Sequence, residues 1–417
     1  MRDIRNDFPI LSKKIGDNQL MYFDNAATTQ KPQQVIDALI NFYTQENGNT
    51  GRSIHTLGES ATSAYEKARE TVAHFINAHD SSEIVFTTGA TASINLVAAT
   101  WAHANLNAGD EILVSELEHH SNLLPWQRLA SQTGASLRFI PVLHDGTLDM
   151  RSFAQVLTDK TKLVAVTHVS NALGTHNPVD EIVKQAHAVG ATVLVDAAQS
   201  IAHQAIDVQK LGADFLAFSG HKMLGPTGIG VLYINKKLHK NFPAYQLGGG
   251  MVYEADFDRT TYLPVPHLLE AGTPPIAQAV GLAAAINYIK QNINFADLQK
   301  HEAQLCAQLI NGLTSINETG NRIHILGNID QLKRSGHLVS FSIDGIHAHD
   351  VAAYFDQHGI AVRAGHHCAQ PLAKKLGIES SIRVSFYAYN TPEEVDYLMR
   401  VLRKLLLLDH PYLREHL

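Results

Sequence analysis

The sequence predicts an α/β protein with a mainly parallel sheet, helices on both faces of that sheet, and a smaller α+β domain toward the C-terminus. Between about residues 20 and 235, short apolar runs alternate with helix-like stretches. Most of these runs are continuously apolar, as strands covered on both faces should be. After residues 248–250, three glycines in a row, the pattern changes to long amphipathic helices with a few alternating strands. This change predicts the second domain.

Seven apolar runs are the expected strands of the large sheet. They are residues 84–87, 111–114, 136–140, 163–166, 193–195, 215–218 and 231–234. Helical patterns lie between them. An example is residues 180–189, which Gly190 follows as a helix-ending residue.

The second part of the chain begins with a predicted loop at 253–275, rich in proline, threonine and tyrosine. Helices are expected at 276–289, 295–313, 348–357 and 393–408, with a strand around 338–343. The predicted organisation is an N-terminal segment (1–20) packing with the small domain, a large domain (21–275) and the small domain (276–417).

Composition narrows the function classes. The chain has 417 residues, 45% apolar and 18% charged, which suits a globular protein with an ample core. A net charge of −7 gives no indication of a nucleic-acid or anionic membrane partner. No apolar run approaches the roughly 20 residues of a membrane span, and the start lacks a signal peptide's hydrophobic region. We therefore expect a cytoplasmic protein.

Cysteine and histidine usage excludes two further classes. Two cysteines in so long a chain exclude a disulfide framework. The pairs His119–His120 and His366–His367 have neither the spacing nor the partner ligands of a zinc site, so no metal is expected.

Lys222 closes an apolar run that is predicted to be a buried strand. Desolvation at such a place lowers the pKa of an amine and produces the free base that Schiff-base chemistry needs. The alternative is a lysine that extends past its strand end to solvent. Asp196 ends the preceding strand, and both side chains should project from the same sheet edge. A lysine with a carboxylate for a pyridinium nitrogen is the minimum provision for pyridoxal phosphate.

Three polar stretches follow other strands. Residues 87–93, including Ala90 and Thr91, join a strand to a helix and predict an anion site, or only an ordinary threonine cap. The ring of His119 can stack on a flat cofactor or be an ordinary surface residue. Asn171 can bind a cofactor substituent or a substrate carboxylate, or merely form a turn.

Cys368 and Arg383 lie in the predicted small domain. Histidines and Arg363 surround Cys368, which favours its thiolate, while glycine and proline nearby indicate an exposed loop. Cys306, in an amphipathic helix, is expected to fill the core. Arg383 interrupts an apolar strand and needs an anionic partner, which is either a substrate carboxylate or an internal carboxylate.

Taken together, the motifs of this chain closely resemble those of cysteine desulfurases, in the fold type I aminotransferase superfamily of pyridoxal-phosphate enzymes (class V). The motifs are YFDNAAT (22–28), RSIHTL (52–57), EHH (118–120), VDAAQ (195–199), SGHK (219–222), EAGTP (270–274) and RAGHHCA (363–369). The last of them is similar to the group II, SufS-like, subfamily. The resemblance runs nearly end to end.

The resemblance implies that Lys222 forms the internal aldimine of pyridoxal 5′-phosphate and that Cys368 is the persulfide-forming nucleophile. His119 completes the expected catalytic set by stacking over the ring. The other expected cofactor contacts are Asp196 at the pyridinium nitrogen, Gln199 at the phenolic oxygen, and Ala90, Thr91, Ser219, His221 and Thr273 around the phosphate, with Thr273 from the other subunit of a homodimer. The expected substrate-binding residues are Asn171, Arg383 and Arg363. Asn171 and Arg383 are expected to bind the substrate carboxylate, and Arg363 to lie near Cys368.

The function that the resemblance implies is removal of sulfur from L-cysteine, giving L-alanine and a persulfide on Cys368. The persulfide would pass to an acceptor protein of the SufE or SufU type for iron–sulfur cluster assembly. Selenocysteine lyase activity is an expected accompaniment. The alternatives are a sulfinate desulfinase or an epimerase of the same superfamily, and a non-enzymatic scaffold, which the retained residues disfavour.

Overall fold

The computed structural model describes residues 4–51, 53–318, 320 and 323–407. The start of the predicted N-terminal segment (1–3), Arg52 of the RSIHTL motif, and the end of the predicted closing helix with the tail (408–417) lie outside the described residues.

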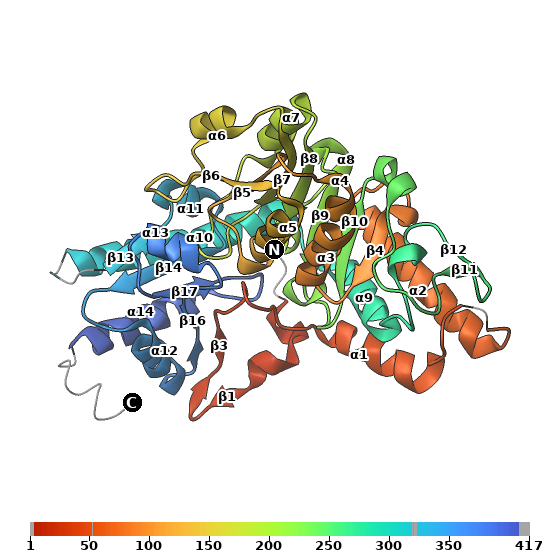
Figure 1. Cartoon of the computed structure of the whole chain (residues 1–417). Coiled ribbons are helices and arrows are strands. Elements are labelled where there is room, and N and C mark those ends of the chain that lie inside the picture. Colours follow the sequence, from red (N-terminus) through yellow and green to blue (C-terminus); the bar gives the residue numbers. More distant parts are fainter. Residues whose placement is uncertain (1–3, 52, 319, 321–322, 408–417) are drawn as a thin grey trace.

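The centre of the fold is a seven-stranded sheet with the order β4-β10-β9-β8-β7-β5-β6 (Figure 1). Its strands are β4 (Ile84–Thr87), β5 (Glu111–Ser115), β6 (Ser136–Ile140), β7 (Thr161–Thr167), β8 (Thr192–Asp196), β9 (Phe215–Ser219) and β10 (Gly230–Ile234). Only β10 runs antiparallel to its neighbours, β4 and β9. The other pairs are parallel. All seven predicted strands are present, and the predicted fold class is confirmed.

Both faces of this sheet are buried, which explains why its strands are continuously apolar. In β8, Val193 and Val195 belong to one hydrophobic cluster and Leu194 belongs to the other. Helices α2 (Thr56–Phe75), α7 (Val179–Ala188) and α9 (Ile276–Asn292) contribute to the first cluster. Helices α3 (Ala90–Val97) and α5 (Leu124–Thr133) contribute to the second.

A second, antiparallel sheet has the order β13-β14-β17-β16. Its strands are β13 (Ile323–Leu326), β14 (Leu338–Ile343), β16 (Arg363–Gly365) and β17 (Ser381–Ser385). The helices α10 (Phe295–Asn317), α12 (Ala348–Gln357) and α14 (Pro392–Leu407) pack on it around a third cluster that includes Cys306. The predicted helices of this region are present, with α9 and α10 a few residues longer than expected.

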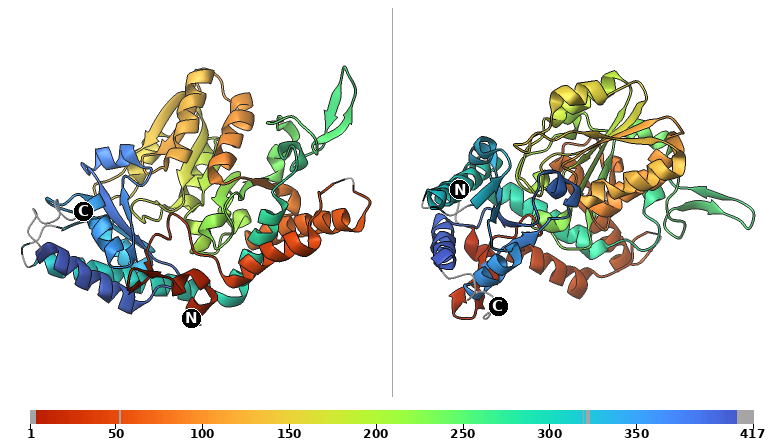
Figure 2. Two further views of the ribbon diagram at one scale, coloured as in Figure 1. Left: turned by 90° about the horizontal axis from the view of Figure 1, so that it is seen from below. Right: turned by 60° about the vertical axis from the view of Figure 1, so that its left-hand side comes forward.

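The predicted loop at 253–275 was partly wrong. It contains a hairpin, β11 (Val252–Ala255) and β12 (Thr260–Tyr262), which projects from the body of the molecule (Figure 2). Threonine and tyrosine favour extended backbone, and residues 256–259, three of which are charged, make the turn between the strands. Because the hairpin buries almost nothing within one chain, it has no apolar period that identifies it.

The N-terminal segment contacts both parts of the fold. Phe8 and Leu11 belong to the first core cluster, and the Arg5 guanidinium binds Glu394 of α14 at 2.8 Å. β3 (Met21–Tyr22), which follows this segment, pairs in parallel with β15 (Ile360–Ala361). α9, by contrast, packs with the core of the large sheet. The division into domains at 21–275 and 276–417 stays a prediction. None of the helices in the described part of the chain combines the length and the apolar character that crossing a membrane requires.

Candidate active site

A cavity of about 260 Å³ lies at the carboxyl ends of the central strands, where the second sheet approaches them. Its walls bring together all but one of the predicted site residues, from segments as distant as β5 and β17. They are Ala90, Thr91, His119, Asn171, Asp196, Gln199, Ser219, His221, Lys222, Arg363, Cys368 and Arg383. Thr273 is the exception. It is exposed and lines a different hollow, beside Gly250 and Glu270.

Lys222 and Asp196 face the cavity from adjacent strands, because β8 and β9 run in parallel and end at the same edge. Burial lowers the pKa of Lys222 to about 8, and Asp196 opposes this shift. Burial also raises the pKa of Asp196, whose Oδ1 accepts a hydrogen bond from the Ala198 amide at 2.9 Å. Lys222 therefore turns into the site rather than extending to bulk solvent, and it is poised to lose its proton.

The start of α3 forms a polar recess in the cavity wall. The Ala90 amide donates to the Ser219 hydroxyl at 2.8 Å, and the hydroxyls of Thr91 and Ser121 lie 2.7 Å apart. A side chain on Gly230 would place its Cβ 2.4 Å from the Cα of Gly89, so only glycine lets β10 approach this turn so closely. The recess offers hydroxyls and the amides of a helix N-terminus, a combination that suits an anion.

His119 lies in the wall with a defined tautomer. Its Nδ1 accepts a hydrogen bond from the Ser121 amide at 3.0 Å, so the proton of the neutral ring is on Nε2. Burial, and to a smaller extent the charge of Lys222, lowers the pKa of His119 to about 4. The ring is therefore neutral at physiological pH.

The preceding residue, Glu118, has a structural role that the sequence reasoning missed. Its carboxylate accepts hydrogen bonds from the Thr167 amide at 2.8 Å and the Asn122 side chain at 2.6 Å. Burial raises the pKa of Glu118 to about 8. These bonds tie the segment that carries His119 to the end of β7. Glu118 lies three residues after the end of β5, so an acidic residue near a strand end, the signal that identified Asp196, could have identified it too.

The Cys368 loop is held in a strained backbone conformation. His367 and Cys368 have φ values of 53° and 56°, in the left-handed region that residues other than glycine seldom adopt. The His120 amide donates to the Cys368 carbonyl at 2.8 Å, and the Asn171 side chain donates to the His367 carbonyl at 2.6 Å. Cys368 is exposed, whereas Cys306 is buried, and burial raises the pKa of the Cys306 thiol. The predicted contrast between the two cysteines is confirmed.

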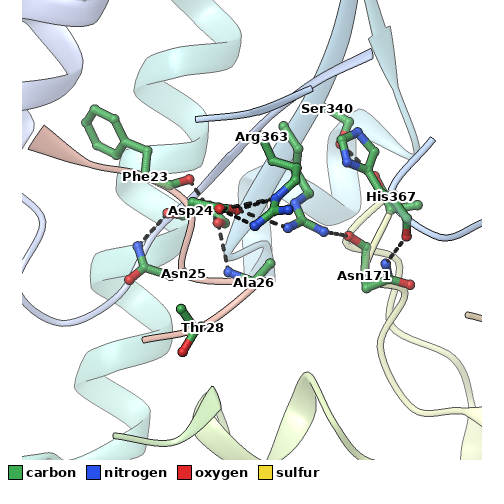
Figure 3. A network of polar contacts seen from close by, with 12 residues as sticks. Phe23, Asp24, Asn25, Ala26, Thr28, Asn171, Ser340, Arg363 and His367 are labelled. Carbon is green, nitrogen blue, oxygen red and sulfur yellow. Dashed lines mark hydrogen bonds and ion pairs between the residues drawn. The ribbon is translucent and has the colours of Figure 1, made fainter. Parts of the chain in front are cut away.

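Arg383 has an internal carboxylate partner, Asp24, at 3.2 Å (Figure 3). Its Nη1 also donates to the Asn171 carbonyl at 2.8 Å, while its buried Nε has no hydrogen-bond partner among the residues that the structure describes. Asp24 lies in the YFDNAAT motif, but no role was predicted for it. The expectation that Arg363 lies near Cys368 agrees with its place in the same cavity wall. Its guanidinium contacts Asp24 as well.

Gln199 has buried partners on both sides. Its Nε2 donates to the Ala26 carbonyl at 2.8 Å, and its Oε1 lies 3.4 Å from Nε2 of His337. His337 stacks on His203, which pairs with Glu302 at 2.8 Å. The sequence reasoning missed these three residues because they come from α10, β14 and a short turn after β8, with no local motif to connect them. Within the described ranges, no group of three or more His, Cys, Asp or Glu side chains is arranged to hold a metal ion.

Comparison with known proteins places this site in a family. The model of the class-V aminotransferases matches residues 21–398. The chain belongs to the class-V aminotransferase family. It is 47% identical to a probable cysteine desulfurase of Halalkalibacterium halodurans over 402 residues, which cover 96% of this chain and 97% of that protein.

Solved structures agree with this placement in the class-V family. The cysteine desulfurase of Thermococcus onnurineus NA1 has a TM-score of 0.91 and 42% identity, covering 97% of this chain and 98% of that one. A structure of C-DES, with glycine covalently linked to its PLP cofactor, has a TM-score of 0.80 and 25% identity, covering 95% and 98% of the two chains. The resemblance to cysteine desulfurases is therefore confirmed, and the protein is an enzyme that depends on pyridoxal phosphate.

The residues present fit this cofactor. Lys222, with its lowered pKa, would provide an amine for its aldehyde, and the buried Asp196 carboxylate would provide a partner for a protonated ring nitrogen. The recess at Ala90, Thr91 and Ser219 offers the donors that a phosphate needs. Both groups open into one cavity, so a single molecule can reach them together.

Proposed function

We propose that this enzyme is a cysteine desulfurase that transfers the sulfur of L-cysteine to Cys368 and releases L-alanine. The observation that carries the proposal is that Lys222 and Cys368, from different parts of the fold, line the same cavity. The names of the relatives support the same reaction. Because Cys368 is exposed, a sulfur bound to it is open to a second protein.

The chain's own groups account for the steps. Bound pyridoxal phosphate supplies an electron sink for the substrate Cα. Lys222 Nζ, with its pKa lowered to about 8, is suited to take the Cα proton. Cys368 Sγ then attacks the substrate sulfur. An S–S bond forms, the substrate C–S bond breaks, and its electron pair stays with Cβ. Cβ takes up one proton to become the methyl group of alanine, and Cα regains the proton that it lost.

Arg383 is the proposed anchor of the substrate carboxylate. Arg383 is buried and lines the cavity, where its guanidinium can pair with an incoming carboxylate. Asn171 is proposed to act with Arg383. Its backbone carbonyl already holds the guanidinium, and its side chain holds the Cys368 loop, so it connects the two reacting partners.

The cofactor contacts follow the arrangement of the walls. We assign Asp196 to the ring nitrogen, Gln199 to the phenolic oxygen and His119 to the ring face. We assign the binding of the phosphate to Ala90, Thr91, Ser219 and His221. The geometry of the recess at α3 and the neutral ring of His119 support these assignments.

Thr273 is proposed to complete the phosphate site of a second subunit. What supports a homodimer is the set of large apolar side chains that one chain leaves exposed around the α2 entry and the projecting hairpin. They include Ile54, Leu247, Tyr253 and Phe257. The acceptor is proposed to be a SufE- or SufU-type protein for iron–sulfur cluster assembly in the cytoplasm. Selenocysteine is proposed as a second substrate, because the same attack applies to selenium.

The alternatives within the superfamily, sulfinate desulfination and epimerisation, do not require a thiol in the cavity. The position of Cys368 in the cavity wall therefore favours the desulfurase. The pKa shifts of Lys222 and Asp196 disfavour a scaffold without activity. Burying these two ionisable groups lowers the stability of the fold, and an inactive scaffold would gain nothing from it.

Mass spectrometry of the holoenzyme after incubation with L-cysteine tests the proposal. We expect one added sulfur on Cys368 and free alanine in solution. Cys368→Ser should lose both while keeping the cofactor absorption, and Cys306→Ala, a change in the buried core, should keep both. Alanine release by Cys368→Ser at the native rate would overturn the proposed role of Cys368.

A further inference from the structure

Asp24 contacts both arginines of the cavity, and Figure 3 shows its contacts with Arg363. Its carboxylate contacts Arg363 through Nε, at 3.1 and 3.2 Å, and through Nη2, at 2.6 Å. It contacts Arg383 through one bond only, at 3.2 Å. The carboxylate therefore forms a forked ion pair with Arg363 and a weaker contact with Arg383.

The backbone around Asp24 is fixed to the strand that carries Arg383. The Ser385 amide donates to the Phe23 carbonyl at 2.7 Å, the Ala26 amide donates to the Ser385 hydroxyl at 2.9 Å, and the Asn25 side chain donates to the Ser385 carbonyl at 2.6 Å. The residues before and after Asp24 are therefore both hydrogen-bonded to Ser385. Its carboxylate has little freedom to leave the arginines.

The side chains of Arg383, Asp24 and Arg363 differ in their exposure to solvent. The side chain of Arg383 is 4% exposed, that of Asp24 is 14% exposed, and that of Arg363 is 48% exposed. A long, half-exposed arginine has several rotamers available, so the fork with Asp24 is what selects one of them. Arg363 and Cys368 line the same cavity, and their charges interact. Releasing Arg363 would leave a full positive charge near the thiol.

We propose that Asp24 is a positioning residue that holds Arg363 in a neutralising ion pair, so that Arg383 alone remains to receive the substrate carboxylate and the field at Cys368 is moderated. The inference rests on the proposed function in taking Cys368 as the reacting thiol and Arg383 as the anchor of the substrate carboxylate. Asp24 itself is not placed in contact with the reacting atoms.

Alkylation of the holoenzyme by iodoacetamide, a neutral reagent, measures the field at Cys368 without any cysteine turnover. The thiolate is the reacting form, and the core position of Cys306 keeps it out of the reaction. Asp24→Asn removes the negative charge and should speed single-site alkylation at pH 7 by about three- to tenfold. Arg363→Gln leaves Asp24 with only its weaker contact to Arg383 and should slow alkylation by a similar factor.

The double variant Asp24→Asn/Arg363→Gln removes both charges and should return the rate to near that of the native enzyme. A merely structural role for Asp24 predicts no such reversal. Asp80→Asn, which removes the carboxylate of an exposed ion pair with Lys236, is the matched control and should leave the rate unchanged.

Equal rates in native enzyme and Asp24→Asn, or a slower rate in Asp24→Asn, would overturn the inference. Labelling of two thiols per chain would show that a variant had unfolded and exposed Cys306. In that event Arg363→Gln decides alone, and an unchanged rate in that variant overturns the proposal. Absence of desulfurase activity in the native enzyme, with these rates as expected, would count against the proposed function only.

Discussion

Arg69 and Glu270 form a bidentate ion pair inside the molecule, with nitrogen–oxygen distances of 2.6 and 2.8 Å. Both side chains are buried, at 1% and 6% exposure. Glu270 also accepts hydrogen bonds from the Phe86 amide at 2.6 Å and the Tyr65 hydroxyl at 2.9 Å. The pair fixes the segment that leads to Thr273 against α2 and β4.

Glu270→Gln should lower the free energy of unfolding by about 3–5 kcal/mol, because it leaves the buried charge of Arg69 without its main partner. Urea denaturation of the native enzyme and the variant measures the difference. Glu66→Gln removes the other carboxylate on Arg69, which is 39% exposed, and should cost less than about 1 kcal/mol. Equal losses in the two variants would contradict this account of the core.

Removal of the cofactor should reveal the cost of burying Lys222. Its pKa falls from an ordinary value of 10.5 to about 8. Between these values the unfolded chain binds more protons, so the stability of the cofactor-free protein rises with pH there. Lys222→Met should therefore be more stable than the native cofactor-free protein by about 3 kcal/mol at pH 7, and the advantage should vanish toward pH 10.5. A difference that does not change with pH would show that the amine is not desolvated.

Acid should destabilise the enzyme through His337. This buried ring has a pKa well below its ordinary value, because burial disfavours its charged form. Below pH 6.5 the unfolded chain binds the proton and the folded chain does not, so stability falls as the pH is lowered. The fall between pH 7 and pH 5, measured by urea denaturation, should be smaller in His337→Gln. The exposed His144→Gln serves as control and should show the native fall.

His119 should be neutral and carry its proton on Nε2 at pH 7, because Nδ1 accepts the Ser121 amide and burial lowers the pKa to about 4. Nitrogen NMR of protein labelled at histidine, with His119→Gln to assign the signal, reports both the charge and the tautomer. A charged ring at pH 7, or a proton on Nδ1, would be inconsistent with this geometry.

The local sequence pattern predicted those candidate site residues that lie at the ends of strands. Asp196 and Lys222 each follow a buried apolar run, and parallel strands deliver their ends to one edge, so their meeting follows from the pattern alone. Gly89 to Thr91 follows the same logic at the end of β4. The hairpin at 252–262 was not predicted, because a segment without a buried face has no hydrophobic periodicity.

The Asp24 contacts and the chain from Gln199 to Glu302 have no counterpart in any local pattern. Asp24 lies 339 residues from Arg363 and 359 from Arg383. His203 and Glu302 are 99 residues apart. Such pairs depend on how one sheet docks against the other, and the hydrophobic period of a strand carries no information about that.

The sequence alone determined the α/β architecture, the lysine and carboxylate of the proposed cofactor site and the exposed cysteine, because hydrophobic periodicity, strand ends and residue chemistry are local properties. Only the tertiary structure decided which carboxylate neutralises which arginine, and that Asn171 holds the Cys368 loop. Those choices depend on distances between segments far apart in the chain, and a charge or amide selects whichever partner folding brings within a few ångströms.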